Sequence, residues 1–580
     1  MKRLIWVAAL CLAAAGARAA AVPNAAALRV PVTITAADRG DYTHVLPTGR
    51  QVSPVGTIAG TPNFPTAVAV AGSRIAVLSN GATRTQSLSL LGRGTLTTSA
   101  RVLAYPRGVT SPPPDGDAVT VPRQDFFQGL AAGPNGMLYA AGGNADDVLA
   151  VALGGDAPRL VRRYPLAWQA FPRTEYPYRY AGPLSGEPRH FYPDAVALGP
   201  RGRHLLVGGM LANAVARIDL ATGAVAYLNV GSYPNALALA DRGRRLVVSL
   251  WGENAVAVVD ARDFRLLGRI QLGPPNAPSA SAPGIHPIAL AADPASSRVF
   301  VALANVDRIA EIDAATLKRV RLIDDAPYPG APPGSYPDAL ALAGGRLYAA
   351  NAGNDDVAVF SVGSGTLLGA IPTGWYPTAL AATPHALYVA AAKGLGAGPN
   401  VRHQWAGDMM GGLVQRIALP LSAADLARDT NRALGNDRFL AAQRTAAAAH
   451  DARLTQALRK KIRTVVLILR ENKTFDQEFG GYPGLGTWAD PHLAMYRRRE
   501  LPNLYALAGG GALFADFDVD GEVTAQGHQW TTAASDSDFV QRTWPAYYSD
   551  RGPVQNPGWT GPQADADTAH GNVPLGFDNP

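Results

Sequence analysis

The chain has 580 residues, a length that favours more than one domain. Only 17% of the residues are charged, while 61 Gly and 46 Pro recur along the chain, which favours a turn-rich, mainly β body over a helical one. The formal net charge of +7 comes from scattered basic residues, so it indicates no nucleic-acid surface and we expect no nucleic-acid partner.

Residues 1–19 have the pattern of a signal peptide. A basic start at residues 1–3 precedes an apolar run at residues 4–15 that is too short to span a bilayer, and residues 17–19 (ARA) supply a cleavage pattern. The alternative is an uncleaved anchor. Cys11, the only cysteine, lies in this segment, so disulfides and thiolate chemistry are excluded from the mature chain. We expect an exported protein, periplasmic or extracellular, without a membrane span.

One short phrase recurs along the first two thirds of the chain. It is an aromatic residue or His, usually followed by Pro and then by small and apolar residues, as in residues 192–198 (YPDAVAL) and 233–239 (YPNALAL). Its shortest spacings are about 40 residues, a period typical of propellers and solenoids. The copies begin at Phe64, Phe126, Tyr192, Tyr233, His286, Tyr336 and Tyr376.

Each repeat predicts four short strands separated by Gly, Pro and Asn turns, which is the pattern of a propeller blade. The repeats resemble the YVTN-type β-propellers of exported bacterial and archaeal proteins. We therefore predict a seven-bladed β-propeller over residues 27–420, with the blades between residues 55 and 419 and residues 27–56 helping to close the ring. A propeller alone does not define a function.

Three insertions are expected to form loops on one rim of the propeller. They are residues 105–124, 165–189 and 273–284. The second is dense in Trp, Tyr, Phe and Arg, which predicts either a recognition surface or aromatic packing of the loop onto the propeller.

Residues 421–460 predict a helical connector, because Pro and Gly become rare and apolar residues recur at helical spacing. Ser422 is a candidate N-cap for a helix that begins at Ala423. A second helix is expected through residues 439–450 and onward.

The metal-binding and catalytic residues are expected in residues 461–580. The apolar run 464–469 (TVVLIL) predicts a central strand of an α/β sheet, buried on both faces. Glu471 and Asn472 follow it, at the carboxyl end of the strand, where ligands collect in open α/β sheets. Their oxygens suit a divalent cation. The alternative is an exposed carboxylate beside a turn-forming Asn.

A helix is expected at residues 501–508 and a further strand at residues 512–517. Thr524 then lies at a junction between strand and helix, where backbone N–H groups favour phosphate oxygens. The alternative for Thr524 is an ordinary helix N-cap. His528 is predicted either to contact substrate or to pack within the helix.

These segments resemble the phosphoesterases of the alkaline phosphatase superfamily that include bacterial phospholipases C and related acid phosphatases. The resemblance implies that Glu471, Asn472 and Thr524 bind a divalent metal ion of unknown identity and that Thr524 is the nucleophile toward a phosphate-ester substrate. The motifs are Glu471-Asn472-Lys473-Thr474-Phe475-Asp476, Pro502-Asn503-Leu504, and Thr524 with Gly527-His528.

The chain departs from that family in one respect. The family completes its two-metal site with Asp and His residues from the later part of the domain, whereas residues 461–580 contain no such cluster and His570 lies in a Gly, Asp and Pro-rich segment. The α/β domain is therefore expected to be incomplete, either truncated or degenerate. Two functions remain open: an exported metal-dependent phosphoesterase with a propeller binding module, or a cell-envelope binding propeller with an inert phosphoesterase remnant.

Overall fold

The computed structural model describes residues 46, 48–81, 86–105, 118–122, 124–154, 157–166, 191–273, 284–396, 405–470, 473–515, 517 and 519–549. The predicted signal peptide, His570 and most of the insertions 165–189 and 273–284 lie outside these residues. Among the described helices, none has the length and apolar character needed to cross a membrane.

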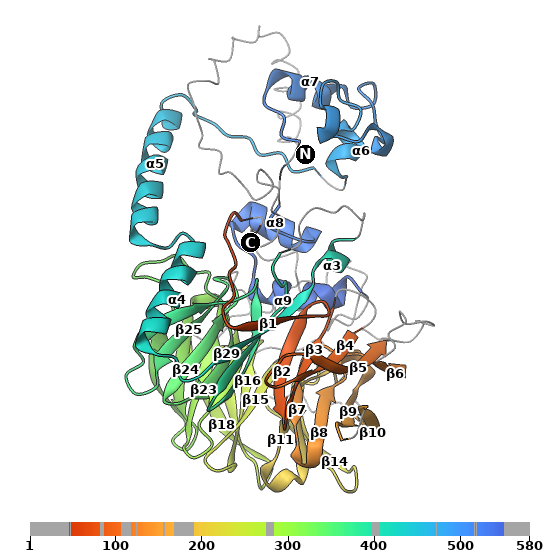
Figure 1. The fold of residues 1–580 in the computed structure, drawn as a ribbon, viewed down its shortest axis with the longest axis vertical. Coiled ribbons are helices and arrows are strands. Elements are labelled where there is room, and N and C mark those ends of the chain that lie inside the picture. Colours follow the sequence, from red (N-terminus) through yellow and green to blue (C-terminus); the bar gives the residue numbers. More distant parts are fainter. Residues whose placement is uncertain are drawn as a thin grey trace, which may run out of the picture. The chain divides into compact units, whose positions relative to one another are not determined.

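Seven sheets form the body of the described chain, which confirms the predicted seven-bladed β-propeller (Figure 1). Their innermost strands contact one another in a closed cycle, from blade one through blade seven and back. The first blade consists of β2 (Pro65–Ala71), β3 (Arg74–Ser79), β4 (Gln86–Gly92), β5 (Thr98–Tyr105) and β6 (Ala118–Pro122). The second consists of β7 (Leu130–Ala132), β8 (Met137–Ala141), β9 (Asp147–Ala152) and β10 (Arg159–Pro165).

The next four blades each have four antiparallel strands in chain order. They are β11 (Pro193–Leu198), β12 (His204–Gly209), β13 (Ala214–Asp219) and β14 (Val225–Asn229); then β15 (Pro234–Ala240), β16 (Arg245–Leu250), β17 (Ala255–Asp260) and β18 (Arg265–Gln271). The last two are β19 (Pro287–Ala292), β20 (Arg298–Leu303), β21 (Arg308–Asp313) and β22 (Lys318–Asp324); then β23 (Pro337–Ala343), β24 (Arg346–Asn351), β25 (Asp356–Ser361) and β26 (Leu367–Pro372).

The seventh blade closes the ring with a strand from the other end of the propeller. It contains β27 (Pro377–Thr383), β28 (Ala386–Ala391) and β29 (Gly412–Ala418), and β1 (Thr57–Thr61) pairs antiparallel with β29, beside which it lies in Figure 1. The closing strand thus begins just after the segment 27–56 that we expected to help close the ring. Pairing β1 with β29 joins the two ends of the propeller by backbone hydrogen bonds.

The insertion 105–124 differs from its prediction as a loop. Part of it forms β6, which pairs in parallel with β5 and gives the first blade a fifth strand. The segment 118–122 (AVTVP) is β-branched and apolar, so it pairs with the otherwise free outer edge of the blade.

The repeated phrase begins six of the seven innermost strands. Its Pro is the first strand residue, a place where the missing N–H costs no ladder hydrogen bond. The aromatic residue or His before it has a positive φ, between 48° and 61°, which is uncommon for residues other than Gly. The residues with this conformation are Phe64, Tyr192, Tyr233, His286, Tyr336 and Tyr376.

A hydrogen bond between neighbouring blades offsets the conformational free energy that the positive φ costs. In four places, an Asp or Asn in a turn of one blade accepts the backbone N–H of the aromatic residue in the next blade. The pairs are Tyr192 to Asp146 (2.9 Å), Tyr233 to Asn213 (3.3 Å), Tyr336 to Asp307 (3.1 Å) and Tyr376 to Asp355 (2.8 Å). Because a positive φ persists only where its surroundings fix it, these bonds explain why the phrase recurs with the blade.

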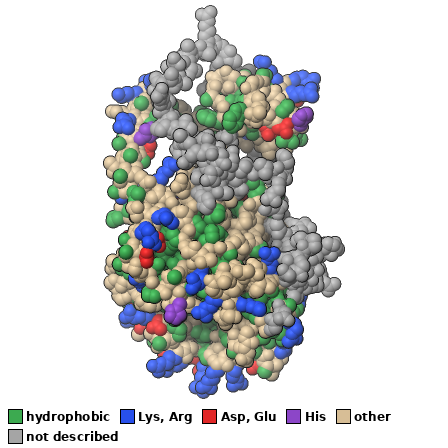
Figure 2. All heavy atoms as spheres, in the orientation of Figure 1, with side chains coloured by type: hydrophobic (Ala, Val, Ile, Leu, Met, Phe, Trp, Pro, Cys, Tyr) green, Lys and Arg blue, Asp and Glu red, His purple; other side chains and the backbone are tan. Residues whose placement is uncertain are grey.

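The cores lie between adjacent blades. Leu206 of β12 packs with Val248 of β16, and Val258 of β17 packs with Val301 of β20. Polar and charged side chains gather in the connecting turns, as with the exposed Arg242. In the view of Figure 2, Lys and Arg side chains gather at the lower end of the propeller.

The helix α3 (Ala406–Met409) lies within the seventh blade, between β28 and β29. The helices α4 (Ala423–Asn436) and α5 (Ala441–Arg459) follow the propeller, after β29. Ser422 is the N-cap of α4, and its Oγ accepts the N–H of Asp425 at 3.0 Å, as predicted. α4 packs on β26, where Thr430 Oγ1 accepts the N–H of Ala370 at 2.9 Å.

The later part of the chain contains α6 (Phe475–Phe479), α7 (Pro502–Gly510), α8 (Thr524–Ala533) and α9 (Asp538–Tyr547). α7 confirms the helix expected at residues 501–508. Stacking of Phe479 on Tyr505, with ring centroids 5.6 Å apart, packs α6 against α7. Short 3-10 turns are η3 (Pro134–Gly136), η4 (Gly143–Ala145), η5 (Pro200–Gly202), η6 (Ala304–Val306), η7 (Gly486–Trp488) and η8 (Pro491–Leu493).

The prediction of two strands in residues 461–580, at 464–469 and 512–517, is wrong for the described residues. Residues 464–469 have no strand pairing, and their apolar side chains are exposed, Val465 by 82%. The described residues of the segment 512–517 are likewise without strand pairing. A β-strand is stabilised by its neighbours, and no described segment pairs with either run. The described C-terminal region is therefore helical, and an α/β sheet is not shown.

Candidate functional site

The structure describes only part of the site predicted from the sequence. Glu471 and Asn472 lie outside the described residues. Thr524 is the first residue of α8 and is partly buried. His528, also partly buried, lies one turn later on the same face of the helix. Among the described residues, no group of three or more His, Cys, Asp or Glu side chains is placed to hold a metal ion.

Thr524 does not cap α8. The N-cap position belongs to Val523, and Gln526 Oε1 accepts the N–H groups of Glu522 (2.8 Å) and Val523 (3.1 Å). The interpretation of Thr524 as an ordinary N-cap is therefore wrong. Gln526 secures the start of the helix, and the Thr524 hydroxyl is not used for that purpose.

A second site, which the sequence did not predict, lies at the third position of the repeated phrase. Six of the seven residues at this position are polar, and all are at most 6% exposed. We call them the axial ring: Thr66, Gln128, Asp194, Asn235, Ile288, Asp338 and Thr378. A buried polar group costs free energy unless it is hydrogen-bonded, so a ring of them within an apolar propeller indicates partners on the axis.

Hydrogen bonds run around and across the axial ring. Gln128 Nε2 of blade two donates to Asn235 Oδ1 of blade four at 2.6 Å, and Asn235 Nδ2 donates to the carbonyl of Ile288 at 2.8 Å. Thr378 Oγ1 donates to the carbonyl of Pro65 at 2.6 Å, which links blade seven to blade one. Because residues of non-adjacent blades meet, these side chains point toward the propeller axis.

Arg542 of α9 completes this network. Its Nη1 lies 2.9 Å from Asp338 Oδ2, and its Nη2 donates to Gln128 Oε1 at 2.7 Å. The Arg542 side chain is 6% exposed and the Asp338 side chain is fully buried. One guanidinium thus bridges blades six and two across the axis. A buried charge of this kind is stable only when paired and hydrogen-bonded, as it is here.

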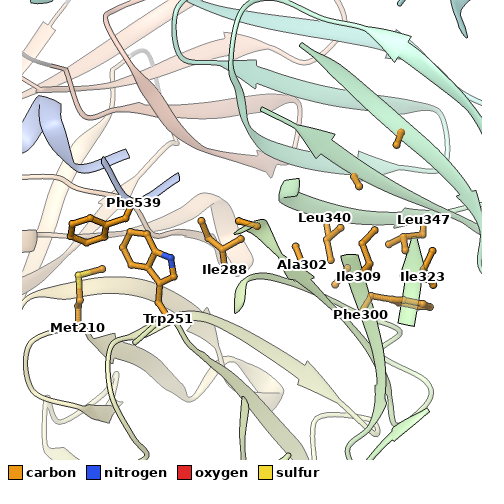
Figure 3. Packing of buried hydrophobic residues seen from close by; sticks show 14 of the residues in the cluster. Met210, Trp251, Ile288, Phe300, Ala302, Ile309, Ile323, Leu340, Leu347 and Phe539 are labelled. Carbon is orange, nitrogen blue, oxygen red and sulfur yellow. The ribbon is translucent and has the colours of Figure 1, made fainter. Parts of the chain in front are cut away.

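Aromatic side chains surround α9 where it meets the propeller. Phe539 packs against Trp251 with ring centroids 5.0 Å apart, and Met210 lies beside them (Figure 3). Trp544, 1% exposed, meets the edge of Phe64, the first residue of the first phrase, at 6.1 Å. Phe64 and Tyr376 therefore have two roles: each precedes the innermost strand of a blade, and each packs in one apolar cluster with Trp544 of α9.

A buried lysine of the propeller connects to α8. Lys393, 1% exposed, lies with its Nζ 2.6 Å from Glu522 Oε1 and 2.7 Å from Gln541 Oε1. Gln541 Nε2 donates to Asp536 Oδ2 at 2.8 Å, and Gln526 Nε2 donates to Gln541 Oε1 at 3.0 Å. The segment just before Thr524 is thereby fixed to the propeller by an ion pair and by hydrogen bonds of the Gln526 and Gln541 side chains.

Carboxyl groups outnumber cations around α9. Burial raises the pKa of Asp536 to about 8, although Lys393 opposes the shift. Burial, reinforced by the neighbouring Asp338, raises the pKa of Asp538 well above its usual value. Burial likewise raises the pKa of Asp194 well above its usual value, against the opposing effects of Gln128 and Arg542. The surroundings of the axial ring therefore favour an additional proton or cation.

Comparisons with known proteins add little about function. No family model matches the chain, and no curated protein matches it. Among solved structures, a catalytically inactive variant of virginiamycin B lyase from Staphylococcus aureus, solved with quinupristin, is 12% identical. It is matched over 62% of this chain and 98% of its own, with a TM-score of 0.41. A streptogramin B lyase structure is also 12% identical, matched over 62% of this chain and 97% of its own, with a TM-score of 0.41. Similarity at this level carries no functional argument. The evidence for seven blades is the set of seven sheets described above.

Proposed function

We propose that the chain is part of a metal-dependent phosphoesterase, exported through its N-terminal segment, that hydrolyses phosphate mono- or diesters with Thr524 as nucleophile. The propeller is its binding module and fixes the helix that begins at Thr524. The proposal rests on the motif that contains Glu471 and Asn472, together with the position of Thr524 in the structure.

The observation that carries the proposal is the ion pair between Lys393 and Glu522. It lies two residues before Thr524 in the chain, and Lys393 is buried in the propeller. Breaking such a pair costs several kcal/mol, about 3–5 for a buried one, so the start of α8 is firmly positioned. A nucleophile requires this kind of fixed geometry, because misplacement of a reacting group lowers the rate steeply.

The chemistry follows from the residue types. The Thr524 hydroxyl would lose its proton to solvent and its oxygen would attack phosphorus, while the P–O bond to the ester oxygen breaks and that oxygen leaves with the bonding electrons and takes up a proton as the alcohol. Water would then attack the phosphothreonine, which releases phosphate and returns the proton to the Thr524 oxygen. N–H groups at the start of α8 would face the phosphate oxygens. Glu471, Asn472 and Thr524 offer the oxygen donors that hard divalent cations prefer. When bound, such a cation lowers the pKa of a hydroxyl and neutralises phosphate charge.

The second candidate is a cell-envelope binding propeller with an inert remnant. It is favoured by the polar axial ring, because Asp338 and Gln128 of the propeller hold a charged side chain, that of Arg542, on the axis. In this case the helical region serves only as a built-in occupant of the propeller.

Activity measurements separate the two candidates. Initial rates would be measured with p-nitrophenyl phosphate and bis(p-nitrophenyl) phosphate over a series of divalent metals. We expect the 580-residue chain to act barely above background, and an extended version that also carries the Asp and His ligands of a complete two-metal site to be active. Thr524→Ala should abolish that activity, whereas Thr531→Ala, whose hydroxyl donates within the helix to the Gly527 carbonyl, should retain it.

Two results would contradict the proposal. Full activity in extended Thr524→Ala would place the nucleophile elsewhere. An extended version that binds metal but hydrolyses neither ester would favour the inert remnant.

A further inference from the structure

The seat of Arg542 has the geometry of a guanidinium receptor. Two different nitrogens of the same planar group reach two acceptors, Asp338 Oδ2 at 2.9 Å and Gln128 Oε1 at 2.7 Å. The acceptors belong to blades six and two, so the closed ring of blades fixes their separation. A rigid fork of donors matches such a pair of acceptors, whereas an ammonium is a compact point charge.

The charges facing this seat also favour a cation. Asp338 contacts Arg542 directly, and Asp194 and Asp538 are close enough to interact with it electrostatically. All three carboxyl side chains are at most 2% exposed. Lys393, the other buried cation near α9, is paired with Glu522 instead. The seat therefore holds more carboxyl groups than cationic groups even with Arg542 in place.

The propeller itself supplies most of the seat. Gln128, Asp194 and Asp338 all belong to the axial ring, and Gln128 is also bonded to Asn235 at 2.6 Å. Only Asp538 comes from α9. Because the acceptors on the propeller are fixed by the blades, the seat should survive removal of the arginine side chain.

We propose that the axial ring is a binding site for guanidinium groups, a receptor for an arginine presented on a helix, which in this chain is occupied by its own Arg542. This inference goes beyond the phosphoesterase proposal and does not depend on catalysis. It assigns to the propeller a ligand chemistry: a planar monocation whose two terminal nitrogens donate to two separate acceptors, Asp338 and Gln128.

Replacement of Arg542 by Ala in the full chain provides the test. The probe is methylguanidinium, which reproduces the end of the arginine side chain, and its binding is followed by saturation transfer from protein to its methyl protons. We expect a clear signal at millimolar probe in Arg542→Ala and none in the unchanged chain. The double variant Arg542→Ala with Asp338→Asn should lose the signal, because Asn keeps the shape but removes the charge.

Matched probes and a matched arginine variant sharpen the result. N-methylurea has the same shape as methylguanidinium but no charge, and methylammonium has the charge but not the planar pair of N–H donors. Neither probe should therefore give a saturation-transfer signal in Arg542→Ala. Arg308→Ala removes an arginine whose partner Asp324 is 64% exposed, and it should create no site for methylguanidinium. Equal signals from either alternative probe, or no signal from methylguanidinium in folded Arg542→Ala, would overturn the proposal.

A measurement on the unchanged chain keeps the proposal testable if Arg542→Ala fails to fold. Excess methylguanidinium should compete with Arg542 by mass action and accelerate hydrogen exchange of the α9 amides several-fold. N-methylurea at the same concentration should leave the exchange unchanged. Equal effects of the two probes, or none from methylguanidinium, would contradict a guanidinium site.

Discussion

Arg542→Met is expected to release α9 from the propeller while leaving the blades intact. Met retains most of the apolar stem of arginine and removes only the guanidinium, so packing changes little. Asp338, whose side chain is fully buried, then loses its charged partner. Removing one partner of a buried ion pair costs about 3–5 kcal/mol. At about 1.4 kcal/mol for each factor of ten, the opening of α9 should become at least ~100-fold more frequent.

Hydrogen exchange read out by mass spectrometry measures that opening. The amides of α9 should exchange ~100-fold faster in Arg542→Met, whereas β24 and β25 should be unchanged, because local opening need not involve the ring. Arg308→Met is the control: its pair with Asp324 is exposed by 40% and 64%, where such pairs are worth about 0–1 kcal/mol. Unchanged exchange of α9 in Arg542→Met would refute the view that this arginine anchors the helix.

Three further predictions concern the propeller and its contacts. Asp536 has its pKa raised from 3.8 to about 8, so its contribution to the stability of the folded state is complete below pH 3.8 and is lost as pH rises to about 8. Asp536→Asn should therefore reduce the change of the denaturant midpoint of unfolding between these two pH values. Gly369→Ala should destabilise the chain by about 1–3 kcal/mol in denaturant unfolding, because its new Cβ would lie 2.9 Å from Leu426 Cγ of α4, while Gly363→Ala, in open surroundings, should be neutral. Asp307→Ala removes the acceptor of two backbone N–H groups of the next blade, at 2.8 and 3.1 Å, and should lower stability by about 1–3 kcal/mol.

The blades could be predicted from the sequence because their signal is repeated and local. Pro at the start of a strand and an aromatic residue with positive φ before it recur in almost every blade, and periodicity in the chain therefore reports the fold. The closing strand β1 has no such repeated signal. β1 is a short strand, paired only on one side, and it lies far from its partner β29 in the sequence.

Other features depend on contacts that no local pattern contains. The run 464–469 has the composition of a buried strand, but composition cannot supply the neighbouring strand that would bury it. Arg542 belongs to an ordinary amphipathic helix in the sequence, and its partner Asp338 is 204 residues away. A usable signal was nevertheless present, since the third position of the phrase is polar in six copies among mostly apolar neighbours.

A structure of the chain with divalent manganese bound would test the proposed catalytic site most directly. We expect a Glu471 carboxylate oxygen, the Asn472 carboxamide oxygen and Thr524 Oγ to lie around one ion, with ligand distances of about 2–2.6 Å. The Lys393–Glu522 ion pair should be retained beside them. A separation of more than about 8 Å between Thr524 Oγ and the Glu471 carboxylate, too far for one ion to bridge, would show that these residues do not form one metal site.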